Sequence, residues 1–244
     1  MRIAIVSDIH GNGMAFDAVL RDLEETSPDL ILHGGDLADG GSSPAEVVDR
    51  IRELGWRGVM GNTDEMLCRI ESLEEFAAQS PAPPSLWAAI REMARVTRDR
   101  LGEARLNWLS HLPRVELEGR VALVHATPAT PWRAPSPEAA ESELESAYAP
   151  LGKSVVVYGH IHRPYVRRVR GRDLGGIVVA NSGSVGLSYD GDCRAAYLVV
   201  DSGTPVIRRV EYDVEAELER RSSCGLPHAD WMGKMLRAAS PQLP

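Results

Sequence analysis

Cysteine is scarce in this chain of 244 residues, which contains only three. Cys68, Cys193 and Cys224 lie far apart, their number is odd, and no pair has the CxxC spacing. This pattern argues against a disulfide framework and favours a reducing compartment.

Long hydrophobic runs are also missing. No stretch approaches the roughly 18 consecutive apolar residues that a membrane-spanning helix needs. The apolar run within "MRIAIVSDIH" has five residues, which is too short for the core of a signal peptide. We therefore expect a cytoplasmic protein that has no membrane partner.

The chain has no excess of positive charge, because its net charge is −8 and its pI is about 5.4. A protein that coats nucleic acid needs basic surface to neutralise phosphates. We therefore expect no extended nucleic-acid surface, although the charge does not exclude a small nucleotide in a local positive site. Internal repeats and low-complexity tracts are absent as well, and the sequence leaves the oligomeric state open.

The chain does contain enough hydrophobic residues, 43 % of the total, to form a sizeable core. Short β-prone runs alternate with amphipathic helices in the first part of the chain. We predict strands at Arg2–Val6, Leu30–Leu32 and Gly58–Met60, and helices at Met14–Glu25 and Pro44–Leu54. This alternation is typical of a parallel sheet with crossover helices.

Residues 65–111 break the alternation, since they are helical throughout apart from an interruption at Ser80–Ser85. We interpret them as a helical cap inserted into a single domain that spans residues 1–244. Beyond the cap we predict strands at Arg120–Val124, Ser154–Tyr158, Tyr165–Val169, Gly176–Ala180, Ala195–Val200 and Pro205–Glu211, a helix at Pro137–Ala149, and a helical tail from Val214 interrupted at Cys224–Pro227. Two sheets packed face to face with helices outside would bury these strands.

Residues able to bind metal follow the predicted strands. They are Asp8 and His10, Asp36, Asn62, His125, and the pair His160 and His162 in "YGHIHRP". Because the carboxyl ends of parallel strands share one edge of a sheet, these residues are expected to converge. Carboxylates, imidazoles and an amide suit Mn, Fe, Zn, Co or Ni better than Ca. The set is large enough for two ions that share one carboxylate.

Together the motifs resemble the calcineurin-like metallophosphoesterase superfamily. The matching blocks are Asp8-x-His10, Gly35-Asp36-x-x-Asp39, Gly61-Asn62-x-Asp64, His125 and Gly159-His160-x-His162. "SDIHGN" and "NSGSVGL" are most similar to its small prokaryotic, phosphodiesterase-like branch. The resemblance implies a four-layer α/β/β/α sandwich of two mixed sheets.

It also implies the ligands of two divalent transition-metal ions (Mn, Fe, Ni or Zn). One ion would be held by Asp8, His10, Asp36 and His162, and the other by Asp36, Asn62, His125 and His160, with Asp36 as the bridge. A metal-bridging hydroxide would then hydrolyse a phosphate ester without a covalent enzyme intermediate. We predict a phosphodiesterase; the alternatives are a phosphomonoesterase, a dinucleoside polyphosphate hydrolase, and a non-catalytic scaffold like the retromer subunit of this superfamily.

Thr63 departs from the family pattern, because many members have histidine after the asparagine of this block. A threonine cannot act as a general acid near pH 7. We predict catalytic roles for Asp36, Asn62 and Asp64. Asp64 and Asp39 would orient ligand imidazoles through hydrogen bonds; the alternative for each is a turn or helix-cap carboxylate.

Three side chains are candidates for substrate binding. Asn12 can contact the phosphate or cap a helix. Arg91 can hold an anion together with Arg95 and Arg98, or belong to a solvated helix face. Trp132 can stack on a base or serve packing alone. His33 precedes Asp36, but we expect it to be structural because every ligand role is already filled.

Overall fold

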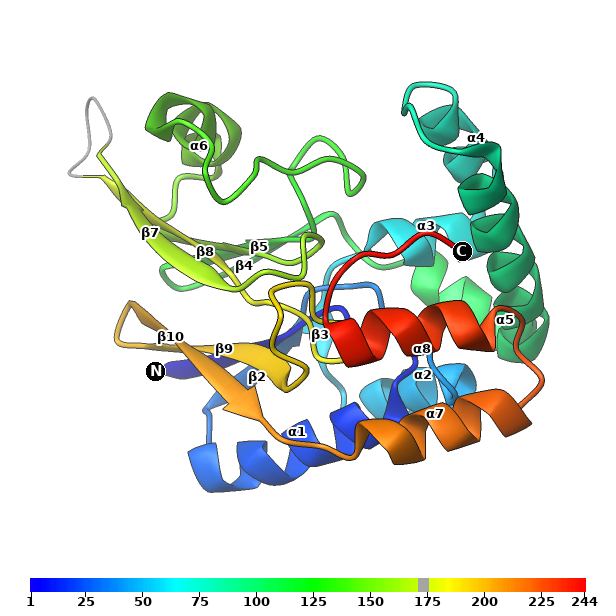
Figure 1. Ribbon diagram of the computed structural model, residues 1–244. Coiled ribbons are helices and arrows are strands. Elements are labelled where there is room, and N and C mark those ends of the chain that lie inside the picture. Colours follow the sequence, from blue (N-terminus) through cyan, green and yellow to red (C-terminus); the bar gives the residue numbers. More distant parts are fainter. Residues whose placement is uncertain (171–175) are drawn as a thin grey trace.

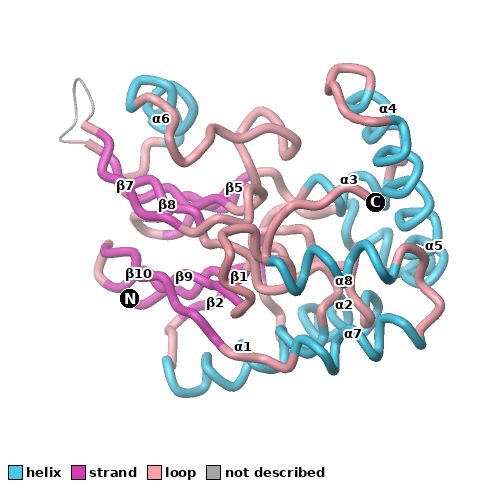
Figure 2. The backbone as a smooth tube through the Cα atoms, in the orientation of Figure 1, coloured by secondary structure: helices cyan, strands magenta, loops and turns pink. Residues whose placement is uncertain are grey.

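The structure, a computed structural model, describes residues 1–170 and 176–244. Within these residues, eight α-helices and one short 3₁₀ helix surround ten strands in two five-stranded sheets. The sheets lie face to face, with helices outside each of them (Figures 1 and 2). The predicted four-layer α/β/β/α class is confirmed.

The first sheet has the strand order β10-β9-β1-β2-β3. Its strands are β1 (Arg2–Val6), β2 (Leu30–His33), β3 (Arg57–Gly58), β9 (Ala195–Asp201) and β10 (Thr204–Val210). The pairs β1–β2 and β2–β3 are parallel, whereas β9 is antiparallel to both β1 and β10. Helices α1 (Gly13–Thr26), α2 (Pro44–Glu53) and α7 (Val214–Ser223) lie on its outer side. All five strands were predicted, although β3 begins and ends earlier than expected.

The second sheet has the order β4-β5-β6-β8-β7. Its strands are β4 (Val115–Glu118), β5 (Val121–Val124), β6 (Val155–Tyr158), β7 (Tyr165–Val169) and β8 (Ile177–Asn181). Helix α6 (Glu141–Tyr148), followed by the 3₁₀ helix Ala149–Leu151, covers its outer face, and α6 begins later than the predicted Pro137. Strand β4 was not predicted. Its sequence, VELE, carries two glutamates that form ion pairs with Arg57 at the edge of the first sheet, so its pattern is that of an edge strand.

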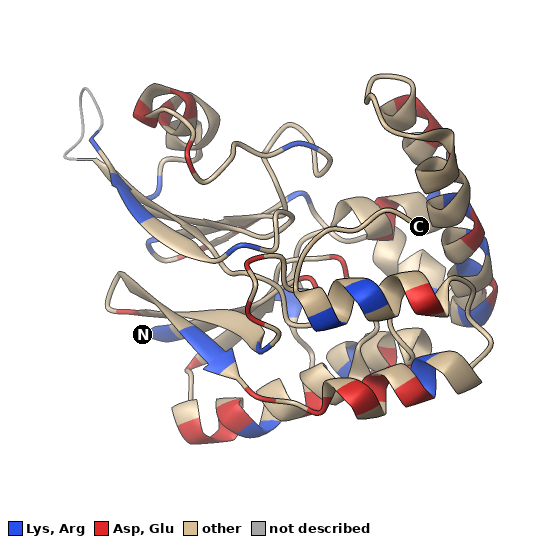
Figure 3. Ribbon diagram, viewed as in Figure 1, with Lys and Arg blue, Asp and Glu red and all other residues tan. Residues whose placement is uncertain are grey.

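Between β3 and β4 the chain forms α3 (Asn62–Cys68), α4 (Glu71–Ala77) and α5 (Pro84–Ser110). The backbone departs from helical geometry at Gly102, so α5 consists of two helices across a kink. A last helix, α8 (Ala229–Ala238), follows α7, and the C-terminal segment then runs back towards α3 (Figure 1). Charged residues are spread along the outer helices α1, α5 and α7 (Figure 3).

Strand alternation places the core. Ile3 and Ile5 face the second sheet, where they pack with Leu123 and Val157. Ala4, next to them in β1, points the other way into the cluster beneath α1, α2 and α5. With both faces buried, residues 3–6 of β1 and 155–158 of β6 form continuous buried runs, as expected for central strands. Burial of each such side chain contributes about 1.5–3 kcal/mol, which makes the strands a firm support for the loops at their ends.

Candidate active site

The predicted ligands lie together where the strands of both sheets end. The loops after β1 and β2 are joined, because the amide of Asp8 donates to the Gly35 carbonyl (3.0 Å) and that of His10 to the Asp36 carbonyl (2.9 Å). The second sheet joins the same edge, since the His160 amide donates to the carboxylate of Asp8. We call the seven residues the ligand cluster: Asp8, His10, Asp36, Asn62, His125, His160 and His162.

The backbone of the ligand cluster is held in an unusual conformation. Nine non-glycine residues of the described chain have positive φ, and five of them belong to the cluster. They are Asp8 (56°), His10 (53°), Asp36 (54°), His160 (66°) and His162 (56°). Each such residue costs roughly 1–3 kcal/mol and persists only where its surroundings enforce it, and such strain gathers at functional sites. These sharp turns direct the side chains inward, whereas an extended backbone would direct them elsewhere.

Two glycines allow the loops to approach each other. A Cβ on Gly61 would lie 2.0 Å from Oδ1 of Asp36, and one on Gly159 would lie 2.3 Å from Oδ2 of Asp8. Both distances are far shorter than van der Waals contact, so any larger residue would displace a carboxylate. The glycines of the "GN" and "GH" motifs therefore make room for the two aspartates.

Four members of the cluster could hold one cation. Asp8, His10, Asp36 and His162 are buried, and each offers one donor atom within 4.8 Å of the others. Nε2 of His162 lies 3.1 Å from Oδ1 of Asp8, and Nε2 of His10 lies 3.7 Å from Oδ2 of Asp36. This group coincides with the first ligand set that the family resemblance implies.

The remaining members meet at Asn62. Its Oδ1 lies 2.9 Å from Nε2 of His125 and 2.8 Å from Nδ1 of His160. Nε2 of His125 is also 3.5 Å from Oδ2 of Asp36. Oδ2 of Asp36 therefore lies between an imidazole of each predicted set, whereas its Oδ1 accepts from the Thr63 amide (2.8 Å).

Hydrogen bonds on the far side of the rings show that the cluster fits a cation. Nδ1 of His10 contacts the Asp39 carbonyl (2.7 Å), and Nδ1 of His162 contacts the Leu187 carbonyl. A carbonyl oxygen only accepts, so each Nδ1 carries the hydrogen, and a neutral ring then has a lone pair on Nε2. These two Nε2 atoms lie 3.2 Å apart and face each other. Two lone pairs at this distance repel, and a cation beside both relieves the repulsion.

Burial and charge prepare the donors for metal binding. Burial, and then the neighbouring His162, lower the pKa of His10 below its usual value. Burial, and then His125, lower the pKa of His160 to about 4. Burial opposes ionisation of Asp8, but His162, His125 and His10 together outweigh it and keep the pKa low. At neutral pH this part of the cluster presents a carboxylate and unprotonated rings, which are the forms that coordinate metals.

Two aspartates near the cluster act differently from the expectation. The carboxylate of Asp64 is fully buried and accepts from the amides of Asp36 (2.7 Å), Leu37 (3.0 Å) and Gly61 (3.0 Å). It therefore holds the two loops together through their backbone and contacts no imidazole by the hydrogen bonds of the described residues. The main-chain carbonyl of Asp39 orients His10, whereas the carboxylate of Asp39 accepts a hydrogen bond from Thr97 (2.7 Å).

Two of the residues predicted to contact substrate use their polar groups within the protein, as the structural alternatives for them predicted. Asn12 is the N-cap of α1, where Oδ1 accepts from the Ala15 amide (3.0 Å) and Nδ2 donates to the Gly186 carbonyl (3.0 Å). Its amide is thus buried and used within the protein. Arg91 is 44 % exposed and forms a bidentate pair with Glu74. Arg91 therefore lies on a solvated helix face, the alternative given for it above, as does Arg95, which pairs with Asp99.

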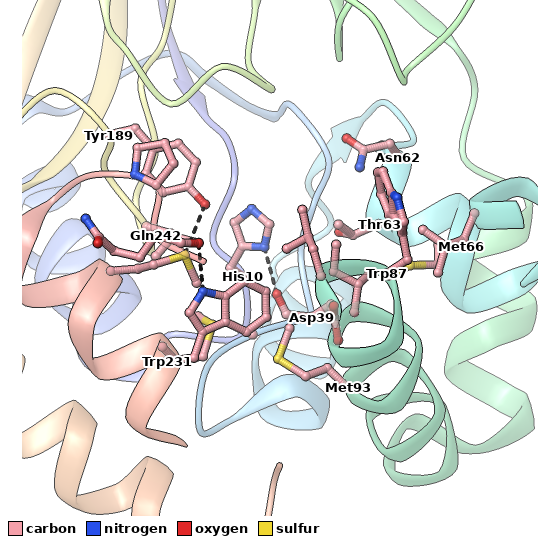
Figure 4. A pocket seen from close by; sticks show the side chains of 18 of the residues that line it. His10, Asp39, Asn62, Thr63, Met66, Trp87, Met93, Tyr189, Trp231 and Gln242 are labelled. Carbon is pink, nitrogen blue, oxygen red and sulfur yellow. Dashed lines mark hydrogen bonds between the residues drawn. The ribbon is translucent and has the colours of Figure 1, made fainter. Parts of the chain in front are cut away.

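A cavity of about 830 Å³ opens over the cluster (Figure 4). His10, Asn62 and His160 form its floor, and Trp132 borders it. We call it the apolar pocket because its walls consist mainly of Met66, Leu73, Phe76, Leu86, Trp87, Ile90, Met93, Trp132, Leu187, Tyr189, Trp231, Met232, Met235, Pro241 and Leu243. Helices α3 to α5 supply one wall, and α8 with the following segment supplies the other.

Sequence reasoning missed several supporting residues. Tyr189 stacks on the ring of His162, with centroids 4.5 Å apart and planes at 21°. Ser7 donates to Oδ2 of Asp8 (2.5 Å). Their position was open to inference, because Ser7 adjoins Asp8 and Tyr189 follows the "NSGSVGL" block. His33 is fully buried, and neither ring nitrogen has a hydrogen-bond partner among the described residues.

A four-layer sandwich with a buried cluster of carboxylates and imidazoles at one edge is typical of metal-dependent hydrolases. Residues 1–204 match the calcineurin-like phosphoesterase superfamily domain, and the chain therefore belongs to this superfamily of phosphoric ester hydrolases. It is 31 % identical to an uncharacterised protein of Methanocaldococcus jannaschii over an alignment 252 positions long, which covers 96 % of each chain.

Solved structures agree with this assignment. A metallophosphoesterase from Sphaerobacter thermophilus is 26 % identical, with a TM-score of 0.79 over 98 % of this chain and 99 % of that one. A protein from Pyrococcus horikoshii has the same fold at 18 % identity, with a TM-score of 0.81 over 99 % of both chains. None of the helices in the described residues is both long and apolar enough to span a membrane.

Proposed function

We propose that this protein hydrolyses phosphodiesters with two divalent transition-metal ions (Mn, Fe, Ni or Zn) held by the ligand cluster. The observation that carries the proposal is the pair of Nε2 atoms on His10 and His162, which face each other beside two carboxylates. When bound, such ions polarise the phosphoryl group as Lewis acids and lower the pKa of water so that it becomes a nucleophile.

Asp8, His10, Asp36 and His162 hold one ion in this proposal, and Asp36, Asn62, His125 and His160 hold the other. Support for a shared Asp36 comes from its Oδ2 atom, which faces His10 and His125 at 3.7 and 3.5 Å. Asp64 is a positioning residue, since it fixes the backbone of both Asp36 and Gly61. The Thr63 side chain borders the pocket, and its buried hydroxyl has no partner among the described residues, so it can donate to a phosphoryl oxygen.

The pocket favours a diester over a monoester. Among the described residues, no lysine or arginine lines it, and its titratable groups are His10, Asp39, His160 and Tyr189. A diester carries one negative charge and a monoester up to two. A site that lacks cationic side chains to compensate a second charge suits the diester better.

We further propose that residues 65–111 act as a cap on a single domain of residues 1–244, and that the protein is cytoplasmic. The cap supplies pocket walls from α3, α4 and α5. The scaffold alternative is disfavoured because every position that the family resemblance assigns to a metal ligand carries a donor side chain.

Removal and return of metal tests the proposed reaction. Protein treated with chelator should lose activity on bis(p-nitrophenyl) phosphate and regain it with Mn²⁺, Ni²⁺, Fe²⁺ or Zn²⁺. Release of p-nitrophenol and metal content by elemental analysis are measured on the same samples. Full turnover by protein shown to be metal-free would overturn the two-metal proposal.

A further inference from the structure

The apolar pocket carries information about the substrate that the ligand cluster does not. Its floor belongs to the cluster, whereas its two walls come from segments far apart in sequence. Trp87 and Met66 lie on the side of α5 and α3, and Trp231 and Gln242 lie on the side of α8 and the C-terminal segment (Figure 4). At about 830 Å³ the cavity is large enough for a group well beyond the phosphate itself.

Several polar groups of these walls are already occupied by the protein. Nε1 of Trp132 donates to Oε2 of Glu65 (2.7 Å), and Nε1 of Trp231 donates to the Gln242 carbonyl (2.9 Å). The Gln242 amide donates to Ser240 (2.9 Å), and the Tyr189 hydroxyl is directed at the sulfur of Met235 (3.8 Å). The walls therefore present ring faces and methionine side chains more than free hydrogen-bonding groups.

This chemistry discriminates between kinds of ester group. A nucleobase would bring several donors and acceptors against walls with few free partners, and unsatisfied polar groups weaken binding. A polyphosphate chain would bring charges that no lysine or arginine lining the pocket compensates, within the described residues. Methionine and aromatic side chains adapt well to apolar groups of varied shape.

We propose that the apolar pocket selects phosphodiesters with a single phosphate and a bulky apolar ester group, which packs between Trp87 on one wall and Trp231, Met235 and Leu243 on the other. This inference rests on the proposed function, because it takes the phosphate to lie at the ligand cluster. It excludes nucleotides and dinucleoside polyphosphates as preferred substrates.

Phosphonates test selectivity without turnover. The dissociation constants of methylphosphonate and 1-naphthylphosphonate are measured by calorimetry on metal-loaded protein. We expect the naphthyl compound to bind at least about tenfold tighter, which corresponds to burying roughly 55 Å² of apolar surface. Trp87→Ala and Leu243→Ala should each lower this ratio about threefold or more and leave methylphosphonate binding unchanged. Leu243 is 58 % exposed, so its replacement does not endanger folding.

Leu117→Ala is the matched control, because Leu117 is an exposed leucine on β4 outside the pocket. Equal affinity for both phosphonates, or a ratio that neither wall variant changes, would overturn the proposed selectivity. Activity is measured separately on p-nitrophenyl methyl phosphate and p-nitrophenyl 1-naphthyl phosphate, which share a leaving group. Selective phosphonate binding without release of p-nitrophenol would overturn the proposed hydrolysis instead, so the two failures are distinguishable.

Discussion

The ligand cluster and the walls of the apolar pocket are built in opposite ways. The cluster consists of polar side chains on short loops, and five of its residues have left-handed backbone. The walls consist of apolar side chains on helices and on the C-terminal segment. The strained loops of the cluster are supported by rigid strands, which gives the fixed geometry that a reaction requires. Substitutions in the helices that line the pocket can occur without disturbing that geometry. In the proposed function, the cluster therefore carries out the reaction and the pocket walls select the substrate.

The sharpest way to break this division is to change Asp36. Asp36→Asn keeps the shape of the side chain but removes the charge that faces His10 and His125. We expect loss of both metal ions and a fall in kcat/KM on the order of a thousandfold, because several kcal/mol of electrostatic stabilisation is lost. His162→Ala should mainly remove one ion.

Elemental analysis and turnover of bis(p-nitrophenyl) phosphate check this pair. Asp17→Asn, an exposed aspartate on α1, controls for the charge change. Wild-type metal stoichiometry in Asp36→Asn would show that Asp36 does not bridge.

Thr63 lies between the two regions, because it adjoins Asn62 and borders the pocket. Without an imidazole acid at this position, the rate should depend steeply on the acidity of the leaving group. Thr63→His should flatten that dependence and accelerate a poor alkyl leaving group by about a hundredfold or more, since a positioned acid contributes roughly 10²–10⁴-fold.

The measurement is kcat/KM across a series of leaving groups, with both proteins loaded with metal. Thr63→Gln is the control, because its side chain is close to histidine in size and polarity but cannot act as an acid. Parallel slopes for wild type and Thr63→His would indicate that another group protonates the leaving group.

A smaller effect is expected beneath the cluster, at His33. Burial lowers the pKa of this histidine to about 3, from an ordinary value of 6.5. Below pH 6.5 the unfolded chain binds a proton that the folded chain does not, so His33 lowers stability as the pH falls from about 6.5 towards 3. The loss is ~1.4 kcal/mol per pH unit.

His33→Leu should remove this contribution. Denaturant unfolding at pH 7 and pH 5 should show a smaller difference in stability for the variant than for wild type. His111→Leu, which replaces an exposed histidine, serves as the control. Equal pH dependence in wild type and His33→Leu would mean that His33 takes up a proton in the folded protein.

Sequence predicted the fold class and the convergence of the ligand residues because both depend on local patterns. Apolar runs identify buried strands, and donors placed after parallel strands must meet at one edge. Strand β4 was not predicted because its glutamates form ion pairs with Arg57, and hydrophobic periodicity gives no indication of such contacts.

The roles of Asn12, Arg91 and Asp64 depend on which atoms lie opposite them. Each residue type is compatible with a substrate or catalytic contact, but the available polar atoms are occupied by backbone amides, a carbonyl or Glu74. The apolar pocket was missed for a related reason. Its walls come from α3, α4, α5, α8 and the C-terminal segment, and no motif indicates that these elements face one another.

One hydrogen-bonded chain connects the two regions. Thr97 on α5 donates to the Asp39 carboxylate, and the Asp39 carbonyl accepts from the ring of His10. A ligand that displaces α5 therefore also shifts an imidazole of the cluster. Thermodynamic linkage makes such coupling reciprocal: if binding of an ester group against α5 alters the affinity of His10 for its cation, that cation alters the affinity for the ester group by the same factor.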